Sequence, residues 1–542
     1  MLNINTIDGV LLRDMLVAGT TMLLNNREKV DSLNVFPVPD GDTGTNMFLT
    51  IQSAMKEVTA KECATASEAA QAIAKGALRG ARGNSGVILS QLFRGFAKEL
   101  LEVEKITPTQ FAMALHRGAR TAYKAVMKPK EGTILTVARV IAEEAIKQAE
   151  QTPDDFNALF DNILTTGDDI LKKTQQMLPV LKQAGVVDSG GCGLLYIYIG
   201  FAAALRGEDL PQNSDIATSA ASYEDIIESY NDLENKPFAY RVESKIIHIK
   251  ATTKAEDIDS FKRRLNQIGD YNFVEQNDTE IRVLAHVKDP SKVLKYSLEL
   301  GEIDEVRVSN LLSSTTIEAV PVELKKYGMV AVSLGEGFSS IFKDLQVDKI
   351  VDGGQTMNPS IDDLSSAIEA VHAENVFVFP NNGNIILAAE QAAKISNKTV
   401  KVLPTKNVAM GISAAIAFNP DTEVEQNYTK MMEAAERVRT GMVTYAVRDT
   451  VFEELEIKKG DIIGLSNGKV SIKGQDIFEV ASNMMKDIVT EDDELISVYF
   501  GSDVQEEDAQ KVADFLADAY PDCDVELQNG GQPLYYYLIS VE

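Results

Sequence analysis

Residues 34–47 read Asn34-Val35-Phe36-Pro37-Val38-Pro39-Asp40-Gly41-Asp42-Thr43-Gly44-Thr45-Asn46-Met47. The two prolines end any helix ahead of two aspartates that a single glycine separates. The residues that follow can begin a helix with Thr45 or Asn46 near its cap. Such a turn aims carboxylates, hydroxyls and backbone N–H groups at one point, which fits a site for Mg²⁺ and phosphate. The alternative is a polar turn between two helices, because Asp, Gly, Thr and Asn are common turn residues.

Around this stretch, residues 8–203 carry apolar residues mostly at helical spacing. Beyond the first helix, which includes residues 11–23, we expect helices at residues 66–77, 87–101, 109–126, 133–152, 154–177 and 194–205. No convincing strand pattern interrupts them. The pattern predicts an all-α bundle or helical barrel at the N-terminal end of a multidomain chain.

The helical part repeats one feature four times, a glycine-bearing polar turn that opens onto a helix. The turns lie at residues 39–46, 80–86, 128–136 and 185–193. Helix N-termini offer unpaired N–H donors and the positive end of a dipole, and glycine lets the backbone approach a ligand closely. Alternate loops of an up-and-down bundle lie at one end, so several turns can converge there. Together they favour a nucleotide site over four ordinary helix caps.

The rest of the chain changes character twice. Residues 204–237 are acidic and poor in large apolar side chains, which predicts a linker with one short helix at 223–233. Residues 238–322 alternate strand and helix patterns and predict a small α+β domain. Residues 327–542 predict an α/β region. From residue 327, short apolar strands alternate with helices and are followed by glycine- and Asn-rich loops, which predicts a mostly parallel sheet. Such loops either bind a ligand or are structural, and the pattern leaves both open. From about residue 443 the pattern returns to mixed strands and helices, and residues 494–500, 505–519 and 535–541 predict a final β-α-β unit.

Composition narrows the function. The chain has 542 residues, 53 basic and 81 acidic, with a net charge of −28. This charge argues against nucleic acid or an anionic membrane as a partner. Three cysteines far apart in sequence fit a reducing cytoplasm. We expect no transmembrane segment, because no apolar run reaches the roughly 18 residues of a membrane span.

Four short strings carry a family resemblance: Asp40-Gly41-Asp42-Thr43-Gly44-Thr45-Asn46, Gly83-Asn84-Ser85-Gly86, Glu131-Gly132-Thr133 and Asp188-Ser189-Gly190-Gly191. They are similar to the four signatures of the nucleotide-binding domain (DhaL domain) of dihydroxyacetone kinase. The longer strings 34–47, 80–91, 127–136 and 185–193, together with 352–360 and 380–388, resemble the ATP-binding subunit of bacterial fatty acid kinase. This resemblance covers nearly the whole chain.

The resemblance implies that the helical barrel binds ATP and two Mg²⁺ ions. It makes Asp40 and Asp42 the catalytic metal ligands. It implies a nucleotide pocket formed by Thr43, Thr45, Asn46, Gly83, Asn84, Ser85, Gly86, Thr133, Asp188, Ser189 and Gly190. The dihydroxyacetone kinase pattern has a third aspartate five residues before its first motif aspartate. That position is Val35 here, and the adjacent Asn34 is a candidate third metal ligand.

The resemblance also implies the reaction and the partners. A separate DegV-like fatty-acid-binding protein would present the fatty acid, and this chain, as a homodimer, would transfer the γ-phosphoryl group of ATP to its carboxylate. The product would be an acyl phosphate for phospholipid synthesis, and the C-terminal region would dock the partner. A carboxylate is ionised at pH 7, so this reaction needs no strong general base.

Some members of the family carry a zinc site in the middle domain. Arg241 stands here where a cysteine is expected, and the expected His-x-His reads Leu284-Ala285-His286. We therefore expect no zinc.

Two other functions remain open. The nucleotide domain alone would suit a kinase for a small carbonyl compound or polyol. A nucleotide-binding regulator without turnover, whose C-terminal half recruits partners, is the third possibility.

Overall fold

The computed structural model describes residues 5–35, 41–61, 63–208, 240–247, 249–250, 253, 255–276, 281–310, 324–354, 358–446, 450–452 and 455–542. The chain divides into two compact units. The first unit combines residues 1–211 with residues 324–542, and the second holds residues 212–323. The helix predicted at 223–233 and most of the predicted linker lie outside the described residues.

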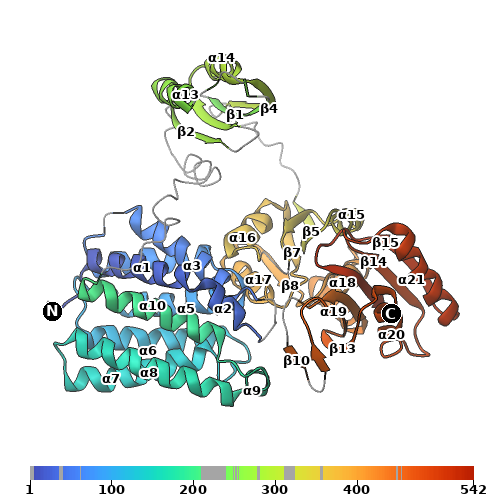
Figure 1. The fold of residues 1–542 in the computed structure, drawn as a ribbon, viewed down its shortest axis with the longest axis horizontal. Helices are drawn as coiled ribbons and strands as arrows, with labels where there is room; N and C mark the ends of the chain where they lie inside the picture. The colour runs from blue at the N-terminus through green and yellow to red at the C-terminus, as the bar shows by residue number, and fades with distance from the viewer. Residues whose placement is uncertain are drawn as a thin grey trace. The chain divides into compact units, whose positions relative to one another are not determined.

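The N-terminal part of the first unit is helical throughout, apart from isolated bridges, in the residues described (Figure 1). Its helices are α1 (Gly9–Asn25), α2 (Arg27–Ser32), α3 (Thr43–Thr59), α4 (Ala66–Arg79), α5 (Gly83–Glu99), α6 (Pro108–Ala125), α7 (Ile134–Gln151), α8 (Phe156–Met177), α9 (Pro179–Ala184) and α10 (Ser189–Arg206). Helices α5, α6, α7 and α8 pack in succession, and α10 packs against α1, α7 and α8. The prediction of an all-α N-terminal domain is confirmed.

Local sequence explains where these helices begin. Thr65 and Thr107 cap α4 and α6 through capping boxes. In each, the threonine hydroxyl accepts the backbone N–H of the third helical residue, and the side chain of that residue accepts the backbone N–H of the threonine. The helices enclose a core of aliphatic and aromatic side chains, in which Phe111 meets Phe96 and Phe156 edge to face.

Helix α10 is long and apolar enough to cross a membrane, but 78% of that segment is buried. We interpret it as a core helix of this domain.

The C-terminal part of the first unit contains two sheets, and the predicted βα units are confirmed. The first is a parallel sheet of order β6-β5-β7-β8, made of β5 (Lys325–Ser333), β6 (Lys349–Asp352), β7 (Ala373–Phe379) and β8 (Thr399–Val402). Its strands alternate with α15 (Glu336–Asp344), α16 (Ile361–Ala370), α17 (Ile386–Ile395) and α18 (Val408–Ile416), and α19 (Val424–Arg437) follows. Buried Val and Phe side chains run along β5 and β7, as expected for a sheet covered on both faces.

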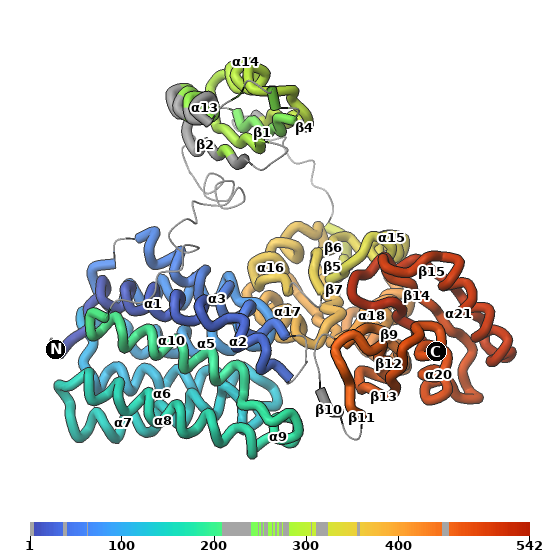
Figure 2. Tube along the Cα trace, viewed as in Figure 1, coloured from blue at the N-terminus to red at the C-terminus, as the bar shows by residue number. Residues whose placement is uncertain are grey.

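The second sheet is mixed and has the order β13-β12-β9-β16-β14-β15. It is built from β9 (Arg439–Tyr445), β12 (Ile462–Ser466), β13 (Lys469–Gly474), β14 (Leu495–Phe500), β15 (Asp524–Asn529) and β16 (Tyr535–Val541), with α20 (Ile477–Met485) and α21 (Glu506–Ala519) beside it (Figure 2). A short hairpin pairs β10 (Thr450–Phe452) with β11 (Leu455–Ile457). The sequence predicted a final β-α-β unit made of the strand at 494–500, the helix at 505–519 and the strand at 535–541. This was wrong, because β15 intervenes and pairs in parallel with β14.

The second unit is the predicted α+β domain. Its antiparallel sheet has the order β2-β3-β1-β4, from β1 (Tyr240–Ile247), β2 (Gly269–Gln276), β3 (Ile281–Val287) and β4 (Glu302–Asn310). Helices α13 (Ala255–Ile268) and α14 (Pro290–Leu300) accompany it. Strand β2 is an addition to the predicted elements. His286 is fully buried and lies opposite Arg241 on the neighbouring strand.

Candidate nucleotide site

The first glycine turn is held by two side chains that precede it. Thr43, the first residue of α3, donates its backbone N–H (3.2 Å) and its hydroxyl (2.6 Å) to Asn34 Oδ1. Asp31 accepts the backbone N–H of Thr45 at 3.0 Å and its hydroxyl at 2.9 Å. Burial raises the pKa of Asp31, although the bonds from Thr45 oppose this. These two acceptors satisfy N-terminal donors of α3 and fix the turn.

Asp42 occupies the cap position of α3, where the sequence had suggested Thr45 or Asn46. That suggestion was wrong, because α3 begins at Thr43 and is capped from upstream by Asn34 and Asp31. The Asp42 side chain is 8% exposed and forms no capping hydrogen bond with the helix that it precedes. Asp40 lies outside the described residues, so its role stays a prediction. The Asn34 amide oxygen already accepts two hydrogen bonds, which occupy both of its lone pairs.

The second turn forms the first turn of α5, whereas the sequence placed that helix only from residue 87 onward. Gly83 has a φ of +58°, and a Cβ there would lie 2.5 Å from Asn46 Nδ2. A Cβ on Gly86 would lie 2.3 Å from the Thr50 hydroxyl. Both glycines are therefore required for the close approach of α5 to the start of α3. This packing brings the first two turns together.

The fourth turn forms the start of α10. This helix begins at Ser189, whereas the sequence predicted a start at residue 194. Asp188 caps this helix, with Oδ2 accepting the Gly191 N–H at 2.7 Å, and it also accepts the backbone N–H of Ile134. Complete burial raises the pKa of Asp188 to about 7, against the effect of these two bonds. Ser189 donates to the Thr43 hydroxyl at 3.3 Å. The fourth turn thus contacts both the first and the third.

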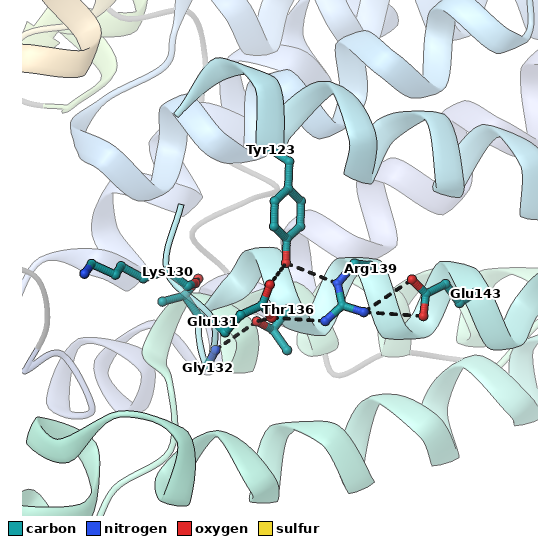
Figure 3. A network of polar contacts seen from close by, with 8 residues as sticks. Tyr123, Lys130, Glu131, Gly132, Thr136, Arg139 and Glu143 are labelled. Carbon is teal, nitrogen blue, oxygen red and sulfur yellow. Dashed lines mark hydrogen bonds and ion pairs between the residues drawn. The ribbon is translucent and has the colours of Figure 1, made fainter. Parts of the chain in front are cut away.

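The third turn is held by a network of its own side chains (Figure 3). Glu131 accepts hydrogen bonds from Tyr123 (2.8 Å), Thr136 (2.6 Å) and Arg139 (3.0 Å). The Thr136 hydroxyl in turn accepts the backbone N–H of Gly132 at 2.8 Å. Burial raises the pKa of Glu131, but these donors outweigh it and hold the pKa below its ordinary value. The network fixes the loop immediately before α7.

The ends of this network reach further along α7 and the loop. Arg139 also pairs with Glu143, and its bond to Tyr123 is the largest cause of a raised pKa of the guanidinium (Figure 3). Thr133, predicted to contact nucleotide, donates its hydroxyl to the Lys130 carbonyl at 2.8 Å. The Lys130 amine points away from the network, towards the outside of the loop (Figure 3).

Contacts therefore connect the four predicted turns in the order second, first, fourth, third. Gly190, like Gly83, is packed tightly, because a Cβ added there would lie 3.2 Å from Ile134 Cβ. The remaining predicted residues, Asn84 and Ser85, lie in the first turn of α5 and are half-buried. The contacts between turns are made by Thr43, Asn46, Gly83, Gly86, Asp188, Ser189 and Gly190. Thr133 instead bonds within its own loop, and Asn84 bonds to Asn384.

Sequence reasoning missed the contribution of the C-terminal part of the same unit. Asn358, only 2% exposed, donates from Nδ2 to Asp42 Oδ2 at 2.6 Å. The Arg82 guanidinium donates to the Asn358 carbonyl at 2.8 Å. Asn84 donates to Asn384 Oδ1 at 2.8 Å. The Asn-rich loops after the strands were a visible signal, but nothing in the sequence showed that they meet the glycine turns.

The chemistry of the donors suits a magnesium–nucleotide complex. At the first glycine turn, the Asp42 carboxylate and the buried Asn358 amide oxygen, which has no hydrogen-bond partner among the described residues, are hard oxygen ligands of the kind that Mg²⁺ takes. Among the residues that the structure describes, no three His, Cys, Asp or Glu side chains gather into a metal site. Mg²⁺ commonly completes its shell with phosphate oxygens and water, so a site with few protein carboxylates fits it when a nucleotide is bound. Helix N-termini at Gly83 and Ser189 suit the phosphates.

Three family models match the chain in succession. The DAK2 domain matches residues 37–203, the middle domain of FakA-like fatty acid kinase proteins matches residues 237–317, and their C-terminal domain matches residues 328–542. Protein YloV of Bacillus subtilis is 40% identical over the full length of both chains. The chain belongs to the FakA-like family of fatty acid kinase subunits. An uncharacterized protein of Staphylococcus aureus strain USA300 is 38% identical over 99% of this chain and all of its own.

Solved structures give partial similarities. DegV, a fatty acid binding protein from Bacillus subtilis, is 13% identical with a TM-score of 0.32. The match covers 40% of the chain described here and 99% of the DegV chain. The dihydroxyacetone kinase of C. freundii is 12% identical with a TM-score of 0.30, covering 55% of this chain and 57% of its own. The family models matched above, and not these partial similarities, identify the chain as a kinase-type protein.

Proposed function

We propose that this chain transfers the γ-phosphoryl group of ATP to the carboxylate of a fatty acid that a separate DegV-like binding protein presents. The observation that carries the proposal is the series of contacts that joins the four glycine turns, the first of which contains the buried carboxylate of Asp42. Membership of a family of kinase subunits supports a second, substrate-bearing protein. The product is an acyl phosphate.

The residues of the site have distinct tasks in this proposal. The N-termini of α5 and α10 direct backbone N–H groups and positive dipole ends toward the phosphates. Asp42 and Asp40 would hold Mg²⁺, and Thr43 and Asn46 lie in the first turn of α3, directly after Asp42. Bound Mg²⁺ neutralises charge on the phosphates and aligns them for in-line transfer. The acceptor carboxylate attacks without losing a proton, so the reaction needs no general base. The chain itself supplies positioning and exclusion of water.

The decisive experiment offers two acceptors to the full-length chain. It is incubated with ATP labelled on the γ-phosphate, Mg²⁺ and either a fatty-acid-loaded DegV-like protein or dihydroxyacetone, and acyl phosphate is trapped with hydroxylamine as the hydroxamate. We expect hydroxamate only with the loaded partner. Label on dihydroxyacetone would establish the alternative, a small-carbonyl kinase, which the DAK2 domain favours. Absence of transfer to any acceptor would leave a nucleotide-binding regulator.

Location and assembly belong to the same proposal. A reaction between ATP and a carried fatty acid fits the cytoplasm, and the resemblance implies a homodimer. Analytical ultracentrifugation of the full-length chain at micromolar concentration tests the second point: a sedimenting species of one chain's mass would contradict it.

A further inference from the structure

The C-terminal α/β region contributes buried polar groups to the turn that contains Asp42. Residues 358–361 lie against the start of α5 through several bonds. The Ile361 N–H donates to the Ala81 carbonyl at 3.1 Å, and Ser360 forms a bridge with Arg82. The Arg82 guanidinium holds the Asn358 carbonyl at 2.8 Å. The backbone of Asn358 is therefore fixed to the helical domain on its own account.

A shared apolar core supports this contact. Ala81 and Val87, at the start of α5, are buried in one cluster with side chains of β5, β7, α16 and α17. Val330, Ile361 and Ile385 in that cluster are all fully buried. Apolar burial of this kind stabilises a fixed arrangement much more than the exposed ion pair of Arg79 and Asp362 does. The position of Asn358 is thus set by packing.

The orientation of the Asn358 amide is set by chemistry. A carboxylate only accepts hydrogen bonds, so the group facing Asp42 Oδ2 at 2.6 Å must be the amide nitrogen. The amide oxygen then points elsewhere, and it is buried with no hydrogen-bond partner among the described residues. A buried carbonyl oxygen without a donor costs free energy. A cation, or a water bound to one, would satisfy this oxygen.

We propose that Asn358 is a positioning residue for the metal–phosphate site, so that the site is completed by the C-terminal region of the same chain. This inference rests on the proposed function and adds a residue to it. The amide nitrogen orients Asp42, and the amide oxygen faces the cation or its water. Side chains that orient metal-ligating groups typically change metal affinity or activity by about 10- to 100-fold when they are removed.

The test measures Mn²⁺, a paramagnetic substitute for Mg²⁺, by electron paramagnetic resonance during titration of the full-length chain with saturating ATP. We expect Asn358→Ala to raise the Mn²⁺ concentration at half-saturation by about tenfold or more. Binding of ATP in excess EDTA should change less than about twofold, since only the metal-dependent part is affected. The matched control is Asn375→Ala, in β7. Its amide nitrogen donates to the Lys326 carbonyl at 2.8 Å, so the substitution should leave both values unchanged.

Three results would overturn the inference. Half-saturation of Asn358→Ala within twofold of the parent chain would remove its role toward the metal. Equal weakening of metal-free and metal-dependent ATP binding would make its role purely structural. A parent chain that takes up no Mn²⁺ with ATP would overturn the proposed function itself. Should Asn358→Ala not fold, as judged by circular dichroism, Asn358→Ser keeps a small polar side chain that cannot span the distance to Asp42, and the same expectations apply.

Discussion

The turn at Asp42 and the turn at Glu131 are held in different ways. Asp42 is 8% exposed and meets a side chain that lies more than 300 residues later in the sequence. The Glu131 side chain is 56% exposed and is held by residues within eight positions of it. The first turn therefore depends on packing between two parts of the unit. The turn at Glu131 depends on local hydrogen bonds, which solvent weakens.

This difference assigns different tasks to the two turns. Buried, oriented groups act in a low dielectric and suit the charge changes of phosphoryl transfer. An exposed loop fixed by its own network suits a contact at the edge of the nucleotide. Substitutions in the first turn should therefore affect turnover, and those in the third should affect mainly stability or nucleotide affinity.

The largest effect is expected from Asp42→Asn. The substitution keeps the shape of the side chain and removes the charge that would hold Mg²⁺. We expect the rate of phosphoryl transfer to fall on the order of 10³-fold, because metal coordination is worth several kcal/mol in such reactions. Single-turnover assays with labelled ATP measure it. The control is Asp362→Asn, an exposed aspartate that pairs with Arg79 at 3.7 Å and should be neutral. If Asp42→Asn lowered the rate of phosphoryl transfer by less than tenfold, the catalytic task assigned to the turn at Asp42, and not to the turn at Glu131, would be contradicted.

Next is a pair of glycine substitutions. Gly83→Ala and Gly132→Ala both place a side chain at positive φ, +58° and +86°. Each should cost about 1–2 kcal/mol of unfolding free energy, measured by denaturant titration. Gly83→Ala also pushes on Asn46 and should weaken ATP binding about tenfold or more, whereas the Cβ at Gly132 meets Met177, at the end of α8, and should weaken binding less. Equal binding losses would show that the two turns do the same work.

Asp188 gives a prediction on pH. Its pKa is about 7 in the folded chain and 3.8 as an ordinary value, so the folded state keeps a proton that the unfolded state releases. Its contribution to stability therefore falls as pH rises from about 4 to about 7, by up to about 1.4 kcal/mol per pH unit. Asp188→Asn should remove this part of the slope while its amide oxygen still accepts the Gly191 N–H. Urea unfolding at pH 5, 6 and 7 measures it, and parallel slopes for both chains would contradict the assignment.

The smallest effect is expected from Glu131→Gln. The amide loses the charge that strengthens the bonds from Arg139 and Thr136, and because Glu131 is exposed the cost should be about 1 kcal/mol or less. The pKa of Glu131 is lowered on folding, so its stabilisation is present above its ordinary pKa of 4.5 and is lost as pH falls through the folded value. Thermal unfolding of the two chains should differ at pH 7 and converge in acid. If the unfolding temperatures still differed in acid, the loss of stability in Glu131→Gln would come from altered packing and not from the lost charge.

Much of the helical domain could be predicted from sequence because each helix carries its own signal. Thr65 and Thr107 mark starts by capping chemistry, and helical spacing marks the faces. The starts of α5 and α10 were placed too late, because their first turns are glycine-rich and resemble loops. Gly83 and Gly190 occur there for close packing against neighbouring helices, which only the fold reveals.

The same limit applied to the site. The four turns were visible as motifs, and their convergence followed from the expected bundle. Asp31 was missed because an aspartate in an ordinary helical stretch gives no sign that it caps a helix 12 residues later. Asn358 was missed because its contact with Asp42 depends on how the parallel sheet packs on α5, and local patterns do not contain that information.

Hydrogen–deuterium exchange on the full-length chain, with and without Mg-ATP, tests most directly whether the nucleotide site spans both parts of the first unit. We predict slower exchange on nucleotide binding at the start of α5, around residues 84–86, and equally at residues 358–361. The loop at 128–133 should show the smaller change. Protection of the helical turns alone, with residues 358–361 exchanging at the same rate in both states, would contradict the account.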